Sequence, residues 1–91
     1  MPFVRGLVWD EWNVEHVARH GVAVEEVEQV CLSSPFVTKA RGGTFRAIGQ
    51  SWAGHYLTVI LSSRGRGTYY TVTAREATQQ ERRLYLKNRG R

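Results

Sequence analysis

The sequence predicts an α+β domain in which two helices precede a four-stranded antiparallel meander and a third helix closes the chain. Three observations support this: helical periodicity over 10–32, four short β-like runs over 36–74 joined by tight turns, and a helix-start signal at Thr78. Helices grouped on one side of such a sheet form a two-layer domain, so we expect the other sheet face to be open or only partly covered. A chain of this length is expected to be one domain, 1–91.

The first helix is predicted over about 10–20, with Asp10 as its N-cap and Gly21 as the left-handed residue that ends it. The second helix is predicted over about 24–32. Its first turn is acidic, which suits the positive end of a helix dipole, and the Ser-Ser-Pro run at 33–35 ends it. An apolar run at 3–9 could add a short edge strand to the sheet.

The strand-like runs cover 36–40, 45–51, 55–63 and 68–74, and their short connections favour antiparallel hairpins. Alternation in the third run places Leu57, Val59 and Leu61 on one face. Side chains expected on the open face are Tyr56, Thr58, Tyr69, Thr71 and Arg46. Tyrosine and arginine on an open sheet suit base stacking and phosphate pairing, although tyrosines are also ordinary cross-strand partners.

The last helix is predicted to start at Thr78, because Thr78 and Glu81 match a capping box. Glu81 is thereby explained as a capping residue. Basic side chains follow it toward the helix C-terminus, where the dipole favours them: Arg82, Arg83, Lys87 and Arg89.

Composition points to a globular protein, with 42% hydrophobic and 23% charged residues and no apolar run long enough to span a membrane. We find no signal-peptide pattern at the N-terminus. Cys31, the only cysteine, cannot form an internal disulfide, which fits a reducing cytoplasm. Its place among inward-facing valines favours a buried packing thiol over a nucleophile.

Charge is distributed unevenly along the chain. Residues 1–31 carry six acids and two bases, whereas residues 32–91 carry two acids and eleven bases. A basic C-terminal two-thirds suggests a polyanion partner, either nucleic acid or an acidic protein. A solvated surface that keeps the protein soluble would explain the same charges.

The first helix carries nitrogen bases on the face that is expected to point inward. At 100° per residue that face holds Trp9, Trp12, Asn13, His16, Val17 and His20. Two histidines at i, i+4 could share a metal, but a third ligand is missing, so we expect no metal or other cofactor. They could instead act in general acid–base catalysis, or fix the helix to the sheet by hydrogen bonds. His20, at the helix end beside Gly21, is the better catalytic candidate, and His16 and Asn13 are the better structural candidates.

Arginines complete the candidate site. Arg75 lies where the last strand turns toward the final helix, and a guanidinium there can clamp a phosphate bidentately. Arg64 and Arg66, in a Gly-rich hairpin, could do the same more loosely.

These constellations, in this order, resemble the BrnT family of small RelE-like ribonuclease toxins from bacterial type II toxin–antitoxin systems. The resemblance covers nearly the whole chain. It rests on Trp9-Asp10, His20-Gly21-Val22, Glu25-Glu26-Val27, Ile48-Gly49, Thr73-Ala74-Arg75, Thr78, Glu81-Arg82-Arg83 and Tyr85. It implies a RelE-like two-layer fold, RNA cleavage without a metal, and neutralisation by a BrnA-like ribbon-helix-helix antitoxin, with DNA bound only through that complex.

The sequence thus leads to two expectations. The first is an endoribonuclease that promotes attack of an RNA 2′-hydroxyl on the adjacent phosphate, with catalytic residues His20, Arg64 and Arg75. The residues expected to bind RNA are Lys39, Arg41, Arg46, Tyr56, Arg66 and Tyr69. The alternative is a non-catalytic module that pairs with a ribbon-helix-helix antitoxin and contributes to operator binding.

Overall fold

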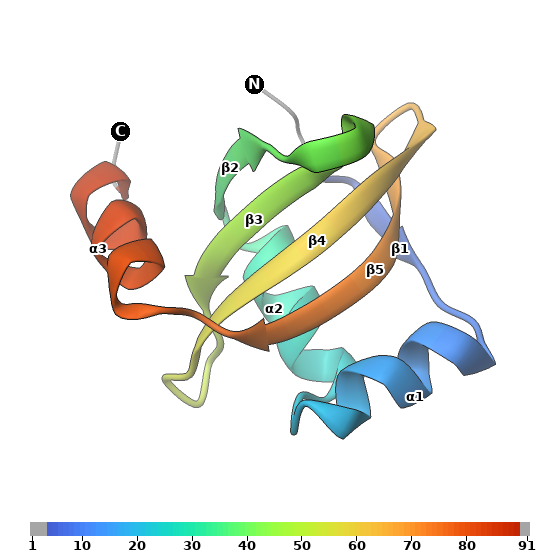
Figure 1. Cartoon of the computed structure of the whole chain (residues 1–91), viewed down its shortest axis with the longest axis horizontal. Coiled ribbons are helices and arrows are strands. Elements are labelled where there is room, and N and C mark those ends of the chain that lie inside the picture. The colour runs from blue at the N-terminus through green and yellow to red at the C-terminus, as the bar shows by residue number, and fades with distance from the viewer. Residues whose placement is uncertain (1–3, 90–91) are drawn as a thin grey trace.

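A computed structural model describes residues 4–89, which form a mixed sheet with helices on both of its faces (Figure 1). The elements in chain order are β1 (Gly6–Val8), α1 (Glu11–Arg19), α2 (Val24–Leu32), β2 (Phe36–Lys39), the 3₁₀ turn η1 (Arg41–Gly43), β3 (Phe45–Gln50), β4 (Tyr56–Gly65), β5 (Thr68–Glu76) and α3 (Gln79–Asn88). The predicted α+β class and the positions of the helices are confirmed. Residue 3, the start of the run predicted at 3–9, lies outside the described residues.

The sheet has five strands in the order β1-β5-β4-β3-β2. Four are the predicted meander, and the fifth, β1, is the short edge strand that the run at 3–9 could add. Strands β2 to β5 pair antiparallel, whereas β1 lies parallel to β5, with Leu7 opposite Tyr69. The short run before α1 therefore becomes a full member of the sheet. A parallel pair needs a long crossover connection, and here α1, α2 and three strands lie between β1 and β5 in the chain.

Helix α1 begins at the predicted N-cap. The Asp10 carboxylate accepts a hydrogen bond from the Asn13 amide at 2.9 Å, and the Asn13 side-chain oxygen accepts one from the Asp10 amide at 2.8 Å. The Asn13 Nδ2 group then donates to the Val8 carbonyl at 2.9 Å and to the Thr71 carbonyl at 3.0 Å. Asn13 is fully buried and joins α1 to β1 and β5, which is the anchoring role predicted for it. Gly21 has φ +75° and ends the helix.

The remaining polar residues of α1 do not point inward as expected. Asn13 and Val17 face the sheet, while Trp12 is 56% exposed. The Trp12 ring stacks on His16 with centroids 4.7 Å apart, and His16 meets His20 edge-on at 5.4 Å. Positions 12, 16 and 20 lie one row away from 13 and 17 on the helix surface, so they form an outer aromatic ladder. No hydrogen bond in the described part of the chain ties His16 to the sheet.

Helix α2 supplies the centre of the core under β3 and β4. Val27, Val30 and Cys31 are buried against strand residues such as Ala47 and Val59. Burial raises the pKa of the Cys31 thiol to about 12, so this cysteine is a packing residue, as predicted.

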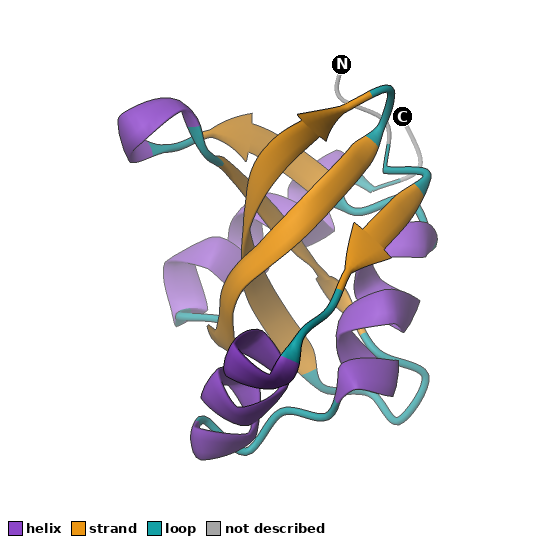
Figure 2. Cartoon of the chain, turned by 90° about the vertical axis from the view of Figure 1, so that its right-hand side faces the viewer, coloured by secondary structure: helices purple, strands orange, loops and turns teal. Residues whose placement is uncertain are grey.

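Helix α3 packs on the opposite face of the sheet, along β2 and β3, so the helices do not all lie on one side (Figure 2). Thr58 and Arg46 point toward it, away from the Leu57–Val59–Leu61 core. The expectation that Thr58 is open is wrong, because the Glu81 side chain of α3 covers it. The β4–β5 part of this face carries partly exposed Ile60 and Thr73 instead.

A β-bulge in β5 places Thr71 and Tyr69 on the opposite face of the sheet from the one predicted. Ile60 lies opposite Thr73, but Leu61 lies opposite Thr71, so Val72 is the extra residue. The inserted residue breaks the alternation and turns Thr71 and Tyr69 toward the α1–α2 side. Both are buried, and the Tyr69 ring meets Phe45 edge-on with centroids 5.8 Å apart. Tyr69 therefore cannot stack on an RNA base, contrary to the prediction.

Candidate functional site

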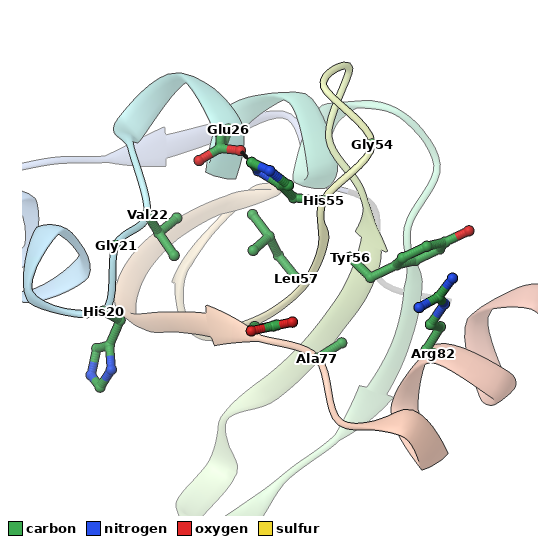
Figure 3. A pocket seen from close by; sticks show the side chains of 11 residues that line it. His20, Gly21, Val22, Glu26, Gly54, His55, Tyr56, Leu57, Ala77 and Arg82 are labelled. Atoms are coloured by element: carbon green, nitrogen blue, oxygen red, sulfur yellow. Dashed lines mark hydrogen bonds and ion pairs between the residues drawn. The ribbon is translucent and has the colours of Figure 1, made fainter.

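A pocket of about 430 Å³ opens at the end of the sheet where β4 begins and β5 ends (Figure 3). Its walls come from the end of α1, the first turn of α2, the two strands and α3. The chemically active lining residues are His20, Glu26, His55, Tyr56, Glu76 and Arg82. Apolar Leu57 lies among them, with His20 on one side and Tyr56 with Arg82 on the other.

Glu26 and His55 form a carboxylate–imidazole pair in this pocket. The His55 Nδ1 atom lies 2.5 Å from Glu26 Oε2, and the two side chains point toward one another in Figure 3. Ser51 supports the pair: its hydroxyl donates to Glu26 Oε2 at 3.4 Å and accepts from the His55 amide at 3.1 Å. The hydrogen bond to His55, joined by one from the Ala23 amide, lowers the pKa of the Glu26 carboxyl. Glu26 is thus held as an anion that orients the ring.

His20 lies at the rim of the same pocket. It is the C-cap residue of α1 and is exposed, and its ring meets that of His16 edge-on. The prediction chose His20 for its position at the helix end, and the structure places it where a bound molecule can reach it.

Tyr56 and Arg82 form the opposite wall. The Arg82 guanidinium carbon lies 4.2 Å from the centre of the Tyr56 ring, and Tyr85 meets that ring edge-on at 6.2 Å. A guanidinium placed over an aromatic ring keeps N–H donors at its edge, and these donors can bind an anion. Tyr56, predicted to bind RNA, is half-buried in this stack rather than open on the sheet.

Arg75 lies beside the pocket and is held by Glu81. Its Nη1 and Nη2 atoms donate to the two Glu81 oxygens at 2.7 and 2.9 Å. Thr58 donates to the same carboxylate at 2.9 Å, and Arg46 lies 3.4 Å from it. Glu81 is also the predicted capping residue, receiving the Thr78 amide at 2.9 Å. The hydrogen bonds from Arg75 hold the pKa of Glu81 at about 2. Two guanidinium groups share one carboxylate, so this Arg46–Arg75–Glu81 cluster keeps a net positive charge.

The other predicted basic residues lie at the far end of the sheet. Lys39 and Arg41 flank the β2–β3 connection, and Arg64 and Arg66 belong to the β4–β5 hairpin. The Arg64 guanidinium covers the Tyr70 ring at 4.8 Å, and the Tyr70 hydroxyl donates to Asp10 at 3.1 Å.

The structure therefore separates Arg64 from His20, which the prediction had combined in one catalytic set. Arg64 is eight residues along β4 from Tyr56, roughly 25 Å at the rise of a strand. Arg75 is close to the pocket but is occupied by Glu81.

Sequence reasoning missed Glu26, His55 and Arg82 as site residues. Glu26 looked like one of several outward acids on α2, and His55 looked like the first residue of an alternating strand. A cue was present in the glycine before His55, since Gly54 has φ +96° and marks the turn that delivers the imidazole to the sheet end.

No group of three or more His, Cys, Asp or Glu side chains within residues 4–89 is placed to hold a metal ion. Over the same residues, no helix has the length and hydropathy that crossing a bilayer would require.

The fold of residues 4–89 is similar to that of a ribonuclease toxin of known structure. That protein is BrnT from Brucella abortus, whose crystal structure superposes with a TM-score of 0.65 and 23% sequence identity. The match covers 81% of this chain and 97% of that chain. This chain therefore has a BrnT-like fold. No protein-family model matches the sequence, and no curated protein matches it either.

Proposed function

We propose that this protein is a toxin that cleaves RNA without a metal ion. The observation that supports this most strongly is the pocket, which presents two imidazoles and a free guanidinium at one end of a fold shared with a ribonuclease toxin. Imidazole transfers protons near neutral pH, and guanidinium stabilises the charge that builds on a phosphate during cleavage.

The proposed reaction is internal transesterification of RNA. The 2′-hydroxyl loses its proton and attacks the adjacent phosphorus, and the bond from phosphorus to the 5′-oxygen breaks. The products are a 2′,3′-cyclic phosphate and a 5′-hydroxyl. His20 serves as an acid or base, and Arg82 binds the phosphate from the opposite wall.

The basic residues outside the pocket are proposed to bind the rest of the RNA strand. The Arg46–Arg75–Glu81 cluster is net positive and lies beside the pocket. Arg75 and Glu81 directly precede the pocket-lining residues Glu76 and Arg82 in the sequence. Lys39, Arg41, Arg64 and Arg66 extend positive charge to the far end of the sheet, where they fit phosphate contacts better than catalysis.

We also propose that an antitoxin controls this activity, and that it is a ribbon-helix-helix protein. The outer surface of α1 supports a protein partner, because Trp12 and Val14 are 56% and 41% exposed there. The same observation favours the second candidate function, a non-catalytic module that acts only by binding this partner.

Incubating the purified protein with RNA in EDTA separates the two functions. The endoribonuclease should give fragments that end in 2′,3′-cyclic phosphate, and His20→Ala should cut at least 100-fold more slowly. Circular dichroism should show that the variant is folded. Binding without cleavage by the wild-type protein would support the module and overturn the enzyme. Co-purification with the product of a neighbouring ribbon-helix-helix reading frame tests the partner.

A further inference from the structure

The Glu26–His55 pair has the arrangement of a general base with its orienting group. A carboxylate only accepts hydrogen bonds, so the His55 Nδ1 atom that faces Glu26 must carry a proton. In the neutral ring the lone pair is then on Nε2, and the His55 side chain is 67% exposed, which leaves that atom accessible. Carboxylates that fix a histidine in this tautomer are a recurring device of acid–base catalysis.

Structural stabilisation alone does not account for this arrangement. The Glu26 side chain is only 18% exposed, and two further donors bond to it: the Ala23 amide and the Ser51 hydroxyl. The Ser51 hydroxyl in turn accepts a hydrogen bond from the His55 amide. An exposed ion pair contributes little to stability. Here a well-supported carboxylate holds an exposed ring at the mouth of a pocket.

The same pocket holds His20, so two imidazoles face one cavity from different elements. His20 comes from the end of α1 and His55 from the start of β4. Charged groups facing the cavity are Glu26 from α2, Glu76 from β5 and Arg82 from α3. Cleavage of RNA by its own 2′-hydroxyl needs one group to take a proton and another to give one, on opposite sides of the phosphorus.

We propose that His55 is the general base of this reaction, that His20 is the general acid, and that Glu26 is the positioning residue for His55. This rests on the proposed ribonuclease function and assigns its machinery. The His55 Nε2 atom takes the 2′-hydroxyl proton, the 2′-oxygen bonds to phosphorus, the bond to the 5′-oxygen breaks, and His20 donates a proton to that oxygen. Arg82 carries the phosphate charge.

An RNA substrate with sulfur in place of the scissile 5′-oxygen separates acid from base. A thiolate leaves without a proton, so the general acid is not needed for this substrate. We expect His55→Ala to cut both substrates about 10²–10⁴-fold more slowly than wild type. His20→Ala should show a similar loss on ordinary RNA but come within about 10-fold of wild type on the sulfur substrate.

Two further variants complete the experiment. Glu26→Gln should lower kcat by about 10-fold or more with KM nearly unchanged, because the ring loses its orienting charge but the pocket keeps its shape. Glu15→Gln is the matched control, since its carboxylate is exposed, pairs with Arg19 and does not line the pocket, and it should stay within about threefold of wild type. Thermal melts should be compared for all four variants.

The outcomes are distinguishable. Wild-type protein that leaves RNA intact would overturn the ribonuclease function and this assignment with it. Active wild type with a folded, equally active His55→Ala would overturn only the role of His55. Rescue of His55→Ala rather than His20→Ala by the sulfur substrate would reverse the two roles and so contradict the proposal. As a measure that does not need activity, nitrogen-15 imidazole shifts in free wild type should show His55 protonated at Nδ1 and should change on addition of adenosine 3′-monophosphate. Failure of either observation contradicts the pair's role.

Discussion

At the scale of single residues, Glu81 and Asn13 hold the molecule together from opposite faces of the sheet. Each caps a helix and also reaches across to strands: Glu81 to β3, β4 and β5, and Asn13 to β1 and β5. Local spacing predicted the Thr78–Glu81 capping box, and the inward face of the first helix predicted that Asn13 fixes this helix to the sheet. The particular strand groups that the two side chains reach could not be predicted, because these partners are distant in the chain.

Glu81 makes stability depend on acid. Its pKa is about 2 in the folded protein against an ordinary value of 4.5, so its stabilisation is complete above about pH 4.5 and is lost as pH falls toward 2. That difference corresponds to about 3 kcal/mol. Glu81→Ala should lower the free energy of unfolding at pH 7 by about 3–5 kcal/mol, since two guanidinium groups lose their carboxylate. Urea titration from pH 2 to 7 should show the gap between wild type and variant closing at low pH.

The matched control is Glu15→Ala, which breaks the exposed pair with Arg19. It should cost no more than about 0.5 kcal/mol at any pH. Equal losses of unfolding free energy in the two variants would show that the Glu81 contacts do not stabilise the fold.

Asn13 allows its two roles to be separated. Asn13→Asp keeps the oxygen that accepts from the Asp10 amide but replaces the Nδ2 donor with an oxygen that faces the Val8 and Thr71 carbonyls. If anchoring dominates, both Asn13→Asp and Asn13→Ala should destabilise by about 2–4 kcal/mol in chemical denaturation. A much smaller destabilisation by Asn13→Asp than by Asn13→Ala would show instead that capping is the main contribution of Asn13 to stability.

At the scale of elements, the contact between α2 and β3 requires a glycine. A Cβ built on Gly49 would lie 3.0 Å from Val30 Cγ1 and 3.6 Å from the Val30 carbonyl oxygen. The Ile48-Gly49 pair, noted in the sequence for its resemblance to a family, therefore has a packing reason here.

Gly49→Ala should therefore push α2 away from the sheet and cost about 1–3 kcal/mol. Gly6→Ala in β1 is the control, because nothing lies within 4 Å of its Cβ position, and it should stay within about 0.5 kcal/mol of wild type. Differential scanning calorimetry of both variants measures the difference. Equal melting temperatures for Gly49→Ala and wild type would contradict a close approach of α2.

Helices and strands with strong local signals could be predicted from the sequence. The faces that they present and the contacts between them were harder to predict. The Asp10 cap, Gly21, the Ser-Ser-Pro stop and the Thr78–Glu81 capping box located the three α-helices to within a few residues. The short turns did the same for strands β2 to β5. The bulge at Val72 left no signal in the alternation, so Tyr69 was assigned to the wrong face. The Glu26–His55 pair joins residues 29 apart, so local spacing could not bring the two side chains together, although Gly54 marks the turn before His55. His20 was found because a helix end can be located from local spacing.

At the scale of the whole molecule, positive charge runs from the pocket to the opposite end of the sheet. If RNA follows this course, Lys39→Ala should weaken binding of single-stranded RNA of any sequence. It should also reduce the slope of log K against log salt by about 0.7, the loss of one phosphate contact. Glu28→Ala, in the acidic segment 1–31, should leave that slope unchanged. Fluorescence anisotropy across a salt series measures both. An unchanged slope for Lys39→Ala would restrict binding to the pocket end.

The parallel pairing of β1 with β5 also limits the order in which the strands and helices can pack during folding. Strands β2, β3 and β4 can pair through short turns as soon as they are made, but β1 has only β5 to pair with, and Asn13 reaches Thr71 across 58 positions. Such distant closures are the slow part of folding. On a ribosome, α1 therefore has no sheet edge to dock on until β5 has emerged, and the Arg82 wall comes later still. The side chains that line the pocket can therefore come together only after Arg82 of α3 has been added to the chain.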